Sequence, residues 1–328
     1  MAESLINSIA RLRVIEKRLL TKEFVGRLCA APDYSECLKL LAEAGYGANA
    51  PEGGDEIEAL TKAQLDEAYL ITSELMPKRY EAITNVFRMR HDVINIKLLY
   101  KLRMIGGDLK SASLEPGGIM GFEALIGAIE KGDYSALPPK IASALEELDV
   151  ATYKNPDPQL VSSRVDGAYI EYARSIHSPF VKEYFGTLAD FTNVLAVARG
   201  FDKEHFLPFG EYGEKELSAL AEAYASEPDR AASVLKPPLD TSPLKECICA
   251  AFESFIKTGS IAAIEKARDD RLNALASERR GDIDSPAPIV GYLLAREREA
   301  EVVRLILTVK RSGIPVSALE ERSLRLYG

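Results

Sequence analysis

The chain has 328 residues, of which 41 are Lys or Arg and 50 are Asp or Glu, giving a formal net charge of −9. Its hydrophobic content of 47% is typical of a globular protein and excludes an intrinsically disordered chain. The acidic balance argues against nucleic acid as a partner, because affinity for phosphate backbones rests on Lys and Arg. At about 100–200 residues per domain, the length allows two or three domains.

Helical periodicity recurs from one end of the chain to the other. Residues 32–34 (Pro-Asp-Tyr) predict the start of a helix that ends at residues 45–47 (Gly-Tyr-Gly), with Leu38 and Leu41 on its apolar face. Residues 300–311 place apolar side chains at i, i+3, i+4 and i+7, which is typical of an amphipathic helix. Apolar–polar alternation of the kind that predicts strands is nearly absent. We therefore expect an all-α fold.

No segment predicts a membrane span or a signal peptide. The longest uncharged apolar run, residues 289–295, is about a third of the ~20 residues that a spanning helix needs. The N-terminal residues lack the apolar core of a signal peptide. The four cysteines form no Cys-x-x-Cys pair, which favours free thiols in a reducing compartment. We expect a cytoplasmic protein.

Two polar elements recur along the sequence. Residues 65–69 (Leu-Asp-Glu-Ala-Tyr) return 100 residues later as residues 165–169 (Val-Asp-Gly-Ala-Tyr). Residues 92–96 (Asp-Val-Ile-Asn-Ile) return 98 residues later as residues 190–194 (Asp-Phe-Thr-Asn-Val). This period is much longer than the about 34–47 residues of common helical solenoid repeats.

A weaker third copy combines residues 270–273 (Asp-Arg-Leu-Asn) with residues 299–303 (Glu-Ala-Glu-Val-Val). Internal repeats of this kind indicate units of common ancestry. We predict three related helical domains, at residues 1–113, 114–205 and 206–328.

The spacing Asp-x-x-Asn places two polar side chains on one helix face, one turn apart. They could form a ligand or ion site in each unit, or a buried pair that hydrogen-bonds a neighbouring helix end. We favour the second, structural interpretation, because buried polar groups are normally satisfied in this way and a metal would need more converging ligands. The residues to which we assign this structural role are Asp66, Tyr69, Asp92, Asn95, Asp166, Tyr169, Asp190, Asn193, Glu299 and Glu301.

No constellation of catalytic residues emerges from the sequence. The three histidines form no zinc motif, and no phosphate-binding P-loop occurs. Residues 242–245 and 257–259 match two boxes of serine β-lactamases, but they lie too close together and the third box is missing. Residues 269–270 resemble the start of an acidic diphosphate motif without its second cluster. We expect no catalytic residue, cofactor or metal.

The order of elements resembles the C subunit, called d in eukaryotes, of V-type and archaeal-type rotary ATPases over essentially the whole chain. The segment 292–304 is similar to the family signature "Y…KE.E..N.R", although Val303 stands where the family often carries Asn. The other segments that carry the resemblance are residues 10–20, 40–47, 80–97 and 190–199.

This resemblance implies three helical domains arranged around a pseudo-threefold axis as a funnel. It implies a non-catalytic central-stalk subunit that turns with the rotor and transmits torque between ATP chemistry and proton or sodium movement. The implied partners are the central shaft subunits and the membrane rotor ring, with the chain attached peripherally at the cytoplasmic face of the membrane. The rim contacts would include residues 48–54 and the turns after each Asn-bearing helix. The alternatives are a generic α-helical scaffold or adaptor and an all-α Mg²⁺-dependent synthase.

Overall fold

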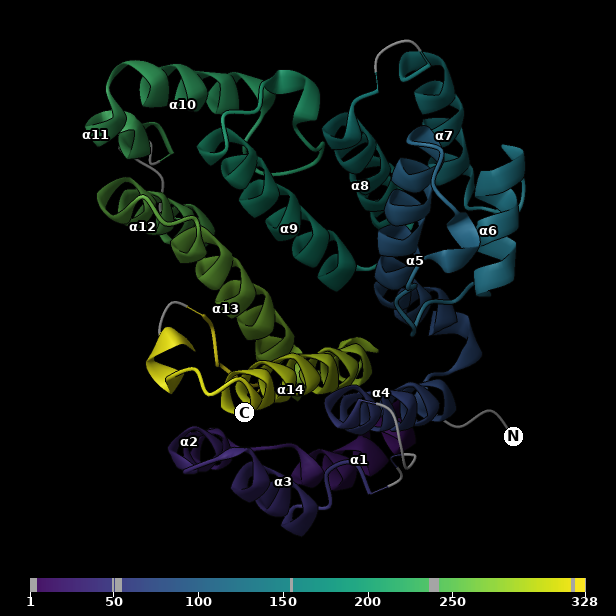
Figure 1. Ribbon diagram of the computed structural model, residues 1–328, viewed down its shortest axis with the longest axis vertical. Coiled ribbons are helices and arrows are strands. Elements are labelled where there is room, and N and C mark those ends of the chain that lie inside the picture. The colour runs from purple at the N-terminus through teal and green to yellow at the C-terminus, as the bar shows by residue number, and fades with distance from the viewer. Residues whose placement is uncertain are drawn as a thin grey trace. The chain divides into compact units, whose positions relative to one another are not determined.

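The computed structural model describes residues 5–48, 50, 55–153, 156–235, 242–319 and 322–327. Every regular element in these ranges is an α-helix or a 3-10 helix, and no strand occurs among them (Figure 1). This confirms the all-α prediction. None of the helices in the described ranges is both long and apolar enough to cross a membrane.

The chain divides into two compact units. The terminal unit combines residues 1–84 with residues 269–328, and the central unit is formed by residues 85–268. The expected domain boundaries at 113/114 and 205/206 and the funnel-shaped pseudo-threefold arrangement stay predictions. The expected rim segment 48–54 lies largely outside the described residues.

The terminal unit contains helices from both ends of the chain. Helix α5 (Glu81–Met104) leaves it and helix α13 (Ala262–Glu278) returns to it, so both helices continue into the central unit. Its other elements are α1 (Leu5–Ile15), η1 (Glu16–Arg18), α2 (Lys22–Ala30), α3 (Tyr34–Glu43), α4 (Glu56–Leu75), η2 (Lys78–Tyr80), η6 (Arg279–Gly281), α14 (Ala287–Arg311) and η7 (Val316–Leu319).

Helix α3 has the limits that its sequence predicts. The Asp33 side chain accepts a hydrogen bond from the backbone N–H of Glu36 at 2.9 Å, which satisfies a donor that the helix itself cannot pair. After the last turn, Gly45 has a φ of +70°, a left-handed conformation that glycine adopts without strain.

Helix α14 is the central helix of the terminal unit, and most of its side chains are buried. The predicted helix 300–311 is the second half of α14, and the apolar run 289–295 lies buried in its first half. Helix α14 runs antiparallel to α4, because Arg311 pairs with Asp55 at 3.0 Å while Glu297 accepts a hydrogen bond from Tyr69 at 3.4 Å. The apolar core beside α14 is formed by α2, α3, the start of α4 and the C-terminal segment.

The central unit is a continuous succession of helices. Its elements are α5 (Glu81–Met104), η3 (Leu109–Ser111), α6 (Phe122–Lys131), α7 (Pro139–Ala151), α8 (Pro158–Ser175), α9 (Pro179–Ala198), η4 (Lys203–His205), α10 (Glu214–Ser226), α11 (Pro228–Ala231), η5 (Ala232–Leu235), α12 (Pro243–Thr258) and α13 (Ala262–Glu278).

Proline opens several of these helices, where its missing N–H costs no hydrogen bond. In α12, Ser242 is the N-cap and Gly259, with a φ of +71°, is the C-cap. The two segments that resemble β-lactamase boxes are therefore the start and the end of one helix, a context unlike that of the enzyme.

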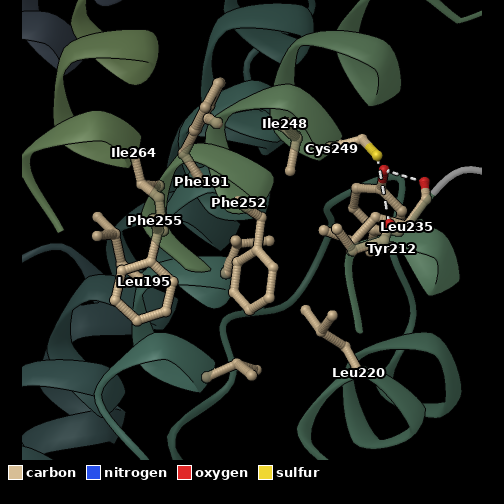
Figure 2. Packing of buried hydrophobic residues seen from close by; sticks show 14 of the residues in the cluster. Phe191, Leu195, Tyr212, Leu220, Leu235, Ile248, Cys249, Phe252, Phe255 and Ile264 are labelled. Carbon is tan, nitrogen blue, oxygen red and sulfur yellow. Dashed lines mark hydrogen bonds between the residues drawn. The ribbon is translucent and has the colours of Figure 1, made fainter. Parts of the chain in front are cut away.

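Aromatic and aliphatic side chains form the core between α9, α10 and α12 (Figure 2). The rings of Phe252 and Phe255 lie 5.5 Å apart between centroids, and both side chains are buried. Tyr212 is buried beside them with its hydroxyl donating to the backbone carbonyl of Leu235 at 2.6 Å. This bond ties the loop before α10 to the end of η5.

Candidate functional site: the repeated polar caps

The first Asp-x-x-Asn pair binds the loop that leads into α6. Asp92 lies buried on α5, and its two carboxylate oxygens accept hydrogen bonds from the backbone N–H groups of Ile119 at 2.8 Å and Met120 at 3.3 Å. One turn later, the Asn95 amide accepts from the N–H of Glu115 at 2.7 Å and donates to the carbonyl of the same residue at 2.8 Å. The pair therefore holds the second half of the loop against α5 at two points, Glu115 and residues 119–120.

The second pair makes the same four hydrogen bonds. On α9, Asp190 accepts from the N–H groups of Glu211 at 2.9 Å and Tyr212 at 3.0 Å. Asn193 accepts from the N–H of Leu207 at 2.6 Å and donates to its carbonyl at 3.0 Å. Asp190 and Asn193 are both fully buried. The repeat in the sequence is therefore accompanied by a repeat in geometry.

A glycine makes room for each carboxylate. A Cβ atom on Gly118 would lie 2.1 Å from Oδ1 of Asp92, and a Cβ atom on Gly210 would lie 2.1 Å from Oδ1 of Asp190. Both distances are far below van der Waals contact. This close approach explains the glycine in the Pro-x-Gly sequence that follows each of these two pairs.

Burial changes the acidity of both caps. It raises the pKa of Asp92, and it raises the pKa of Asp190 to about 6, while the hydrogen bonds from the capped N–H groups act in the opposite direction. The loop before α6 is also bound from the preceding turn of α5. The Arg88 guanidinium donates to the carbonyls of Gly117 at 3.1 Å and Gly118 at 2.9 Å.

The third copy uses a longer side chain and a distant loop. Glu299 lies buried on α14, where its carboxylate accepts from Arg296 at 2.7 Å and from the backbone N–H of Leu20. Leu20 stands two residues before the start of α2, as Met120 does before α6 and Tyr212 before α10. The loop that Glu299 caps therefore comes from the N-terminal segment.

The sequence repeat does not single out the buried arginine that accompanies this cap. Arg296 is 4% exposed, and it donates to the hydroxyl of Tyr292 at 3.1 Å and to the side-chain carbonyl of Gln64 at 3.2 Å. Burial raises the pKa of Glu299 to about 7, although the neighbouring guanidinium lowers it. A charged residue directly after the apolar run 289–295 is the signal that could have identified Arg296.

Asp-x-x-Asn in residues 270–273 binds the C-terminal segment. Asp270 accepts from the hydroxyl of Ser323 at 2.6 Å, and the Asn273 amide donates to the carbonyl of Leu326 at 2.8 Å. The motif again anchors an irregular segment to a long helix, here α13.

The first polar element of the repeat does not produce equivalent contacts. Asp166 on α8 forms an ion pair with Lys97 at 2.6 Å. The Tyr169 hydroxyl donates to the carbonyl of Val86 at 2.6 Å, whereas Tyr69 reaches the carboxylate of Glu297. These residues connect helices within their own unit without capping a loop.

Two of the predicted residues lie on the surface. Asp66 pairs with Lys62 at 2.5 Å, one turn away on the same helix, and Glu301 pairs with Arg298 at 3.0 Å on α14. Exposed pairs of this kind contribute little to stability. In the part of the chain that the structure describes, no group of three His, Cys, Asp or Glu side chains converges as a metal site would.

The fold and these caps define an all-α protein in which long helices hold the loops of repeated helical units through buried polar side chains. The family model of the ATP synthase (C/AC39) subunit matches residues 8–322, so the chain belongs to this family. The resemblance to the C subunit of V-type and archaeal-type ATPases is thereby confirmed.

Curated relatives carry the same designation. The chain is 24% identical to the C subunit of the A-type ATP synthase of Methanothermobacter thermautotrophicus, over 92% of this chain and 79% of the relative. It is 20% identical to the C subunit of the V-type sodium ATPase of Enterococcus hirae, over 98% of both chains. It is 23% identical to the C subunit of the A-type ATP synthase of Methanocaldococcus jannaschii, over 92% of this chain and 81% of the relative.

Proposed function

We propose that the chain is a non-catalytic central-stalk subunit of a rotary ATPase, which links the central shaft to the membrane rotor ring and transmits torque between them. Its membership of the ATP synthase (C/AC39) subunit family supports this proposal, as do relatives named as the C subunits of an A-type ATP synthase and of a V-type sodium ATPase. Attachment at the cytoplasmic face of the membrane, through the ring, is part of the proposal.

The observation that carries the mechanical part of the proposal is the buried carboxylate cap, which occurs on α5, α9 and α14. A subunit that transmits torque must resist bending where a long helix passes into a loop. Each cap holds such a loop through backbone N–H groups, and breaking it would leave buried polar groups unpaired at a cost of about 1–3 kcal/mol each. The capped loops are therefore stiff connections between helices.

Purification of the complex tests the proposal. A tagged chain, isolated from native membranes in mild detergent, should bring down shaft, ring and nucleotide-binding subunits in fixed proportion. Recovery of the chain without other ATPase subunits would contradict the proposal. It would instead favour a scaffold without a transport role.

Cross-linking separates a rotor subunit from a stationary one. A covalent link between this chain and a shaft subunit should leave ATP hydrolysis by the complex intact, because the two parts turn together. A link between this chain and a peripheral-stalk subunit should stop hydrolysis, and its reversal should restore it. The opposite result would place the chain in the stator.

A further inference from the structure

One face of α5 in the central unit carries exposed aliphatic side chains. Ile94 is 42% exposed and Leu98, one turn later, is 37% exposed, while Ile105, directly after the helix, is 76% exposed. At 1.5 Å per residue, Ile94 and Leu98 lie about 6 Å apart along the helix axis, and Ile105 follows at the end of the helix. Large aliphatic residues are usually buried, and a contiguous exposed group of them is typical of a binding surface.

Two lysines border this aliphatic strip on the side that faces α8. The ammonium group of Lys97 pairs with Asp166 at 2.6 Å, and that of Lys101 donates to the hydroxyl of Ser162 at 2.6 Å. Within the described part of the central unit, these contacts between α5 and α8 thus bring together two ammonium groups and one carboxylate. Burial and the charge of Lys97 both lower the pKa of Lys101. A second carboxylate beside Lys101 would stabilise its charged form.

We propose that Ile94, Leu98 and Ile105, together with Lys97 and Lys101, form a docking face for an amphipathic helix of another subunit. That helix would present aliphatic side chains at one-turn spacing and an acidic side chain beside Lys101. This inference rests on the proposed function, which supplies a complex with further subunits. The spacing of one turn between the first two aliphatic residues matches the way helices recognise one another.

Charge and geometry argue against other occupants. The two lysines are held against α8 and so do not extend outward to lipid headgroups, whereas a helix packed on the aliphatic strip would bring its own carboxylate to Lys101. A second copy of the same face would bring lysines towards lysines. The acidic amphipathic helix alone matches both the aliphatic strip and the excess positive charge.

Photo-cross-linking in the assembled complex tests the face directly. A benzophenone amino acid in place of Leu98 or Ile105 should form a product with a helical peptide of another subunit that contains an acidic residue. The same amino acid in place of Val150, 81% exposed on α7, is the control for reactions outside the face. Products only with this chain itself, with a second copy or with lipid, or no product in an intact complex, would overturn the proposal.

Charge reversal provides the second test. Lys101→Glu should increase dissociation of the chain from the complex by about tenfold or more, since truncating a partner of a desolvated interfacial charge acts mainly on the dissociation rate. Lys110→Glu, which changes the net charge equally at an exposed position of the same unit, should leave dissociation unchanged. Equal behaviour of the two variants would overturn the proposal.

A third variant guards against misfolding. Lys101→Glu places a new carboxylate near Asp166 and could disturb the fold. Ile105→Ser, at an exposed position, is therefore measured as well. It should also weaken retention of the chain in the complex while the melting temperature of the isolated chain stays unchanged. Failure of the wild-type chain to co-purify with ATPase subunits would overturn the proposed function as well. Co-purification with cross-links that avoid residues 98 and 105 would overturn the docking face alone.

Discussion

The carboxylate of Glu299 accepts a hydrogen bond from the backbone N–H of Leu20, across 279 residues of sequence. Asp92 and Asp190 make the equivalent bond to loops that follow their own helices within 28 and 22 residues. In the third copy, the N-terminal segment takes the place of the following loop. Helix α2 is thus related to α14 as α6 is to α5 and α10 is to α9.

Removing the charge of Glu299 should destabilise the terminal unit. At a pH well above the Glu299 pKa of about 7, Glu299→Gln removes the carboxylate partner of the buried Arg296 guanidinium, and breaking a buried ion pair from one side costs about 3–5 kcal/mol. Urea unfolding should therefore show a lower midpoint. The matched control is Glu301→Gln, whose side chain is exposed on the same helix and should change stability by less than about 0.5 kcal/mol. Similar midpoints for the two variants would contradict the assigned role of Glu299.

Replacing Asp92 by Asn should loosen the loop before α6. The amide offers one acceptor atom where the carboxylate offers two, so one partly buried N–H group loses its partner at a cost of about 0.5–1.5 kcal/mol. Hydrogen exchange should become faster at the backbone amides of Ile119 and Met120. Asp66→Asn removes an exposed carboxylate from α4 and should leave the exchange of these amides unchanged.

The two cap glycines should not tolerate a side chain. Gly118→Ala would drive a Cβ atom into the Asp92 carboxylate, so we expect a loss of stability of about 1–3 kcal/mol from the broken cap. Gly127→Ala is the control, because this glycine lies inside α6 with no neighbouring atom within 4 Å of an added Cβ. It should stabilise the chain by about 0.5–1 kcal/mol through helix propensity. Thermal or urea unfolding measures both, and equal signs would refute the clash at Gly118.

The pH dependence of stability should reveal the buried carboxylate of Asp190. Its pKa of about 6 in the folded chain exceeds the ordinary value of 3.8, so the folded state holds a proton that the unfolded state has released. The corresponding stabilisation is complete below about pH 4 and is lost as the pH rises through about 6, by roughly 3 kcal/mol in total.

Asp190→Asn isolates this contribution, because an amide does not titrate. The free energy of unfolding of the wild-type chain, minus that of the variant, should fall between pH 4 and pH 7. Parallel pH profiles would show that Asp190 does not titrate in this range.

The helical fold could be predicted because its signals are local. Asp33 and the glycines after residue 44 mark the ends of α3, and apolar spacing marks α14. The Asp-x-x-Asn pairs were recognisable for the same reason, since both polar residues lie within one turn. The groups to which these pairs bind could not be predicted. They are backbone N–H groups, which almost every residue type has, so the sequence does not distinguish one from another.

Similar sequence did not guarantee similar contacts in the first polar element. Asp66 and Asp166 occupy the same position in the repeat, yet Asp66 pairs with Lys62 of its own helix and Asp166 pairs with Lys97 of α5. What each carboxylate meets depends on the neighbouring helix, and the repeat pattern holds no information about that neighbour. The contact between Glu299 and Leu20 escaped prediction for a related reason, since no local pattern joins positions so far apart.

The caps also bear on how such a chain can diverge. Asp92, Asn95, Asp190 and Asn193 bind main-chain atoms of their loops, so the side chains of those loops can be exchanged without loss of these bonds. The caps require only that the loop backbone keeps its path and that a glycine lies next to each carboxylate. A chain built in this way can diverge to the 20–24% identity that it shares with these relatives without losing the hydrogen bonds of its caps.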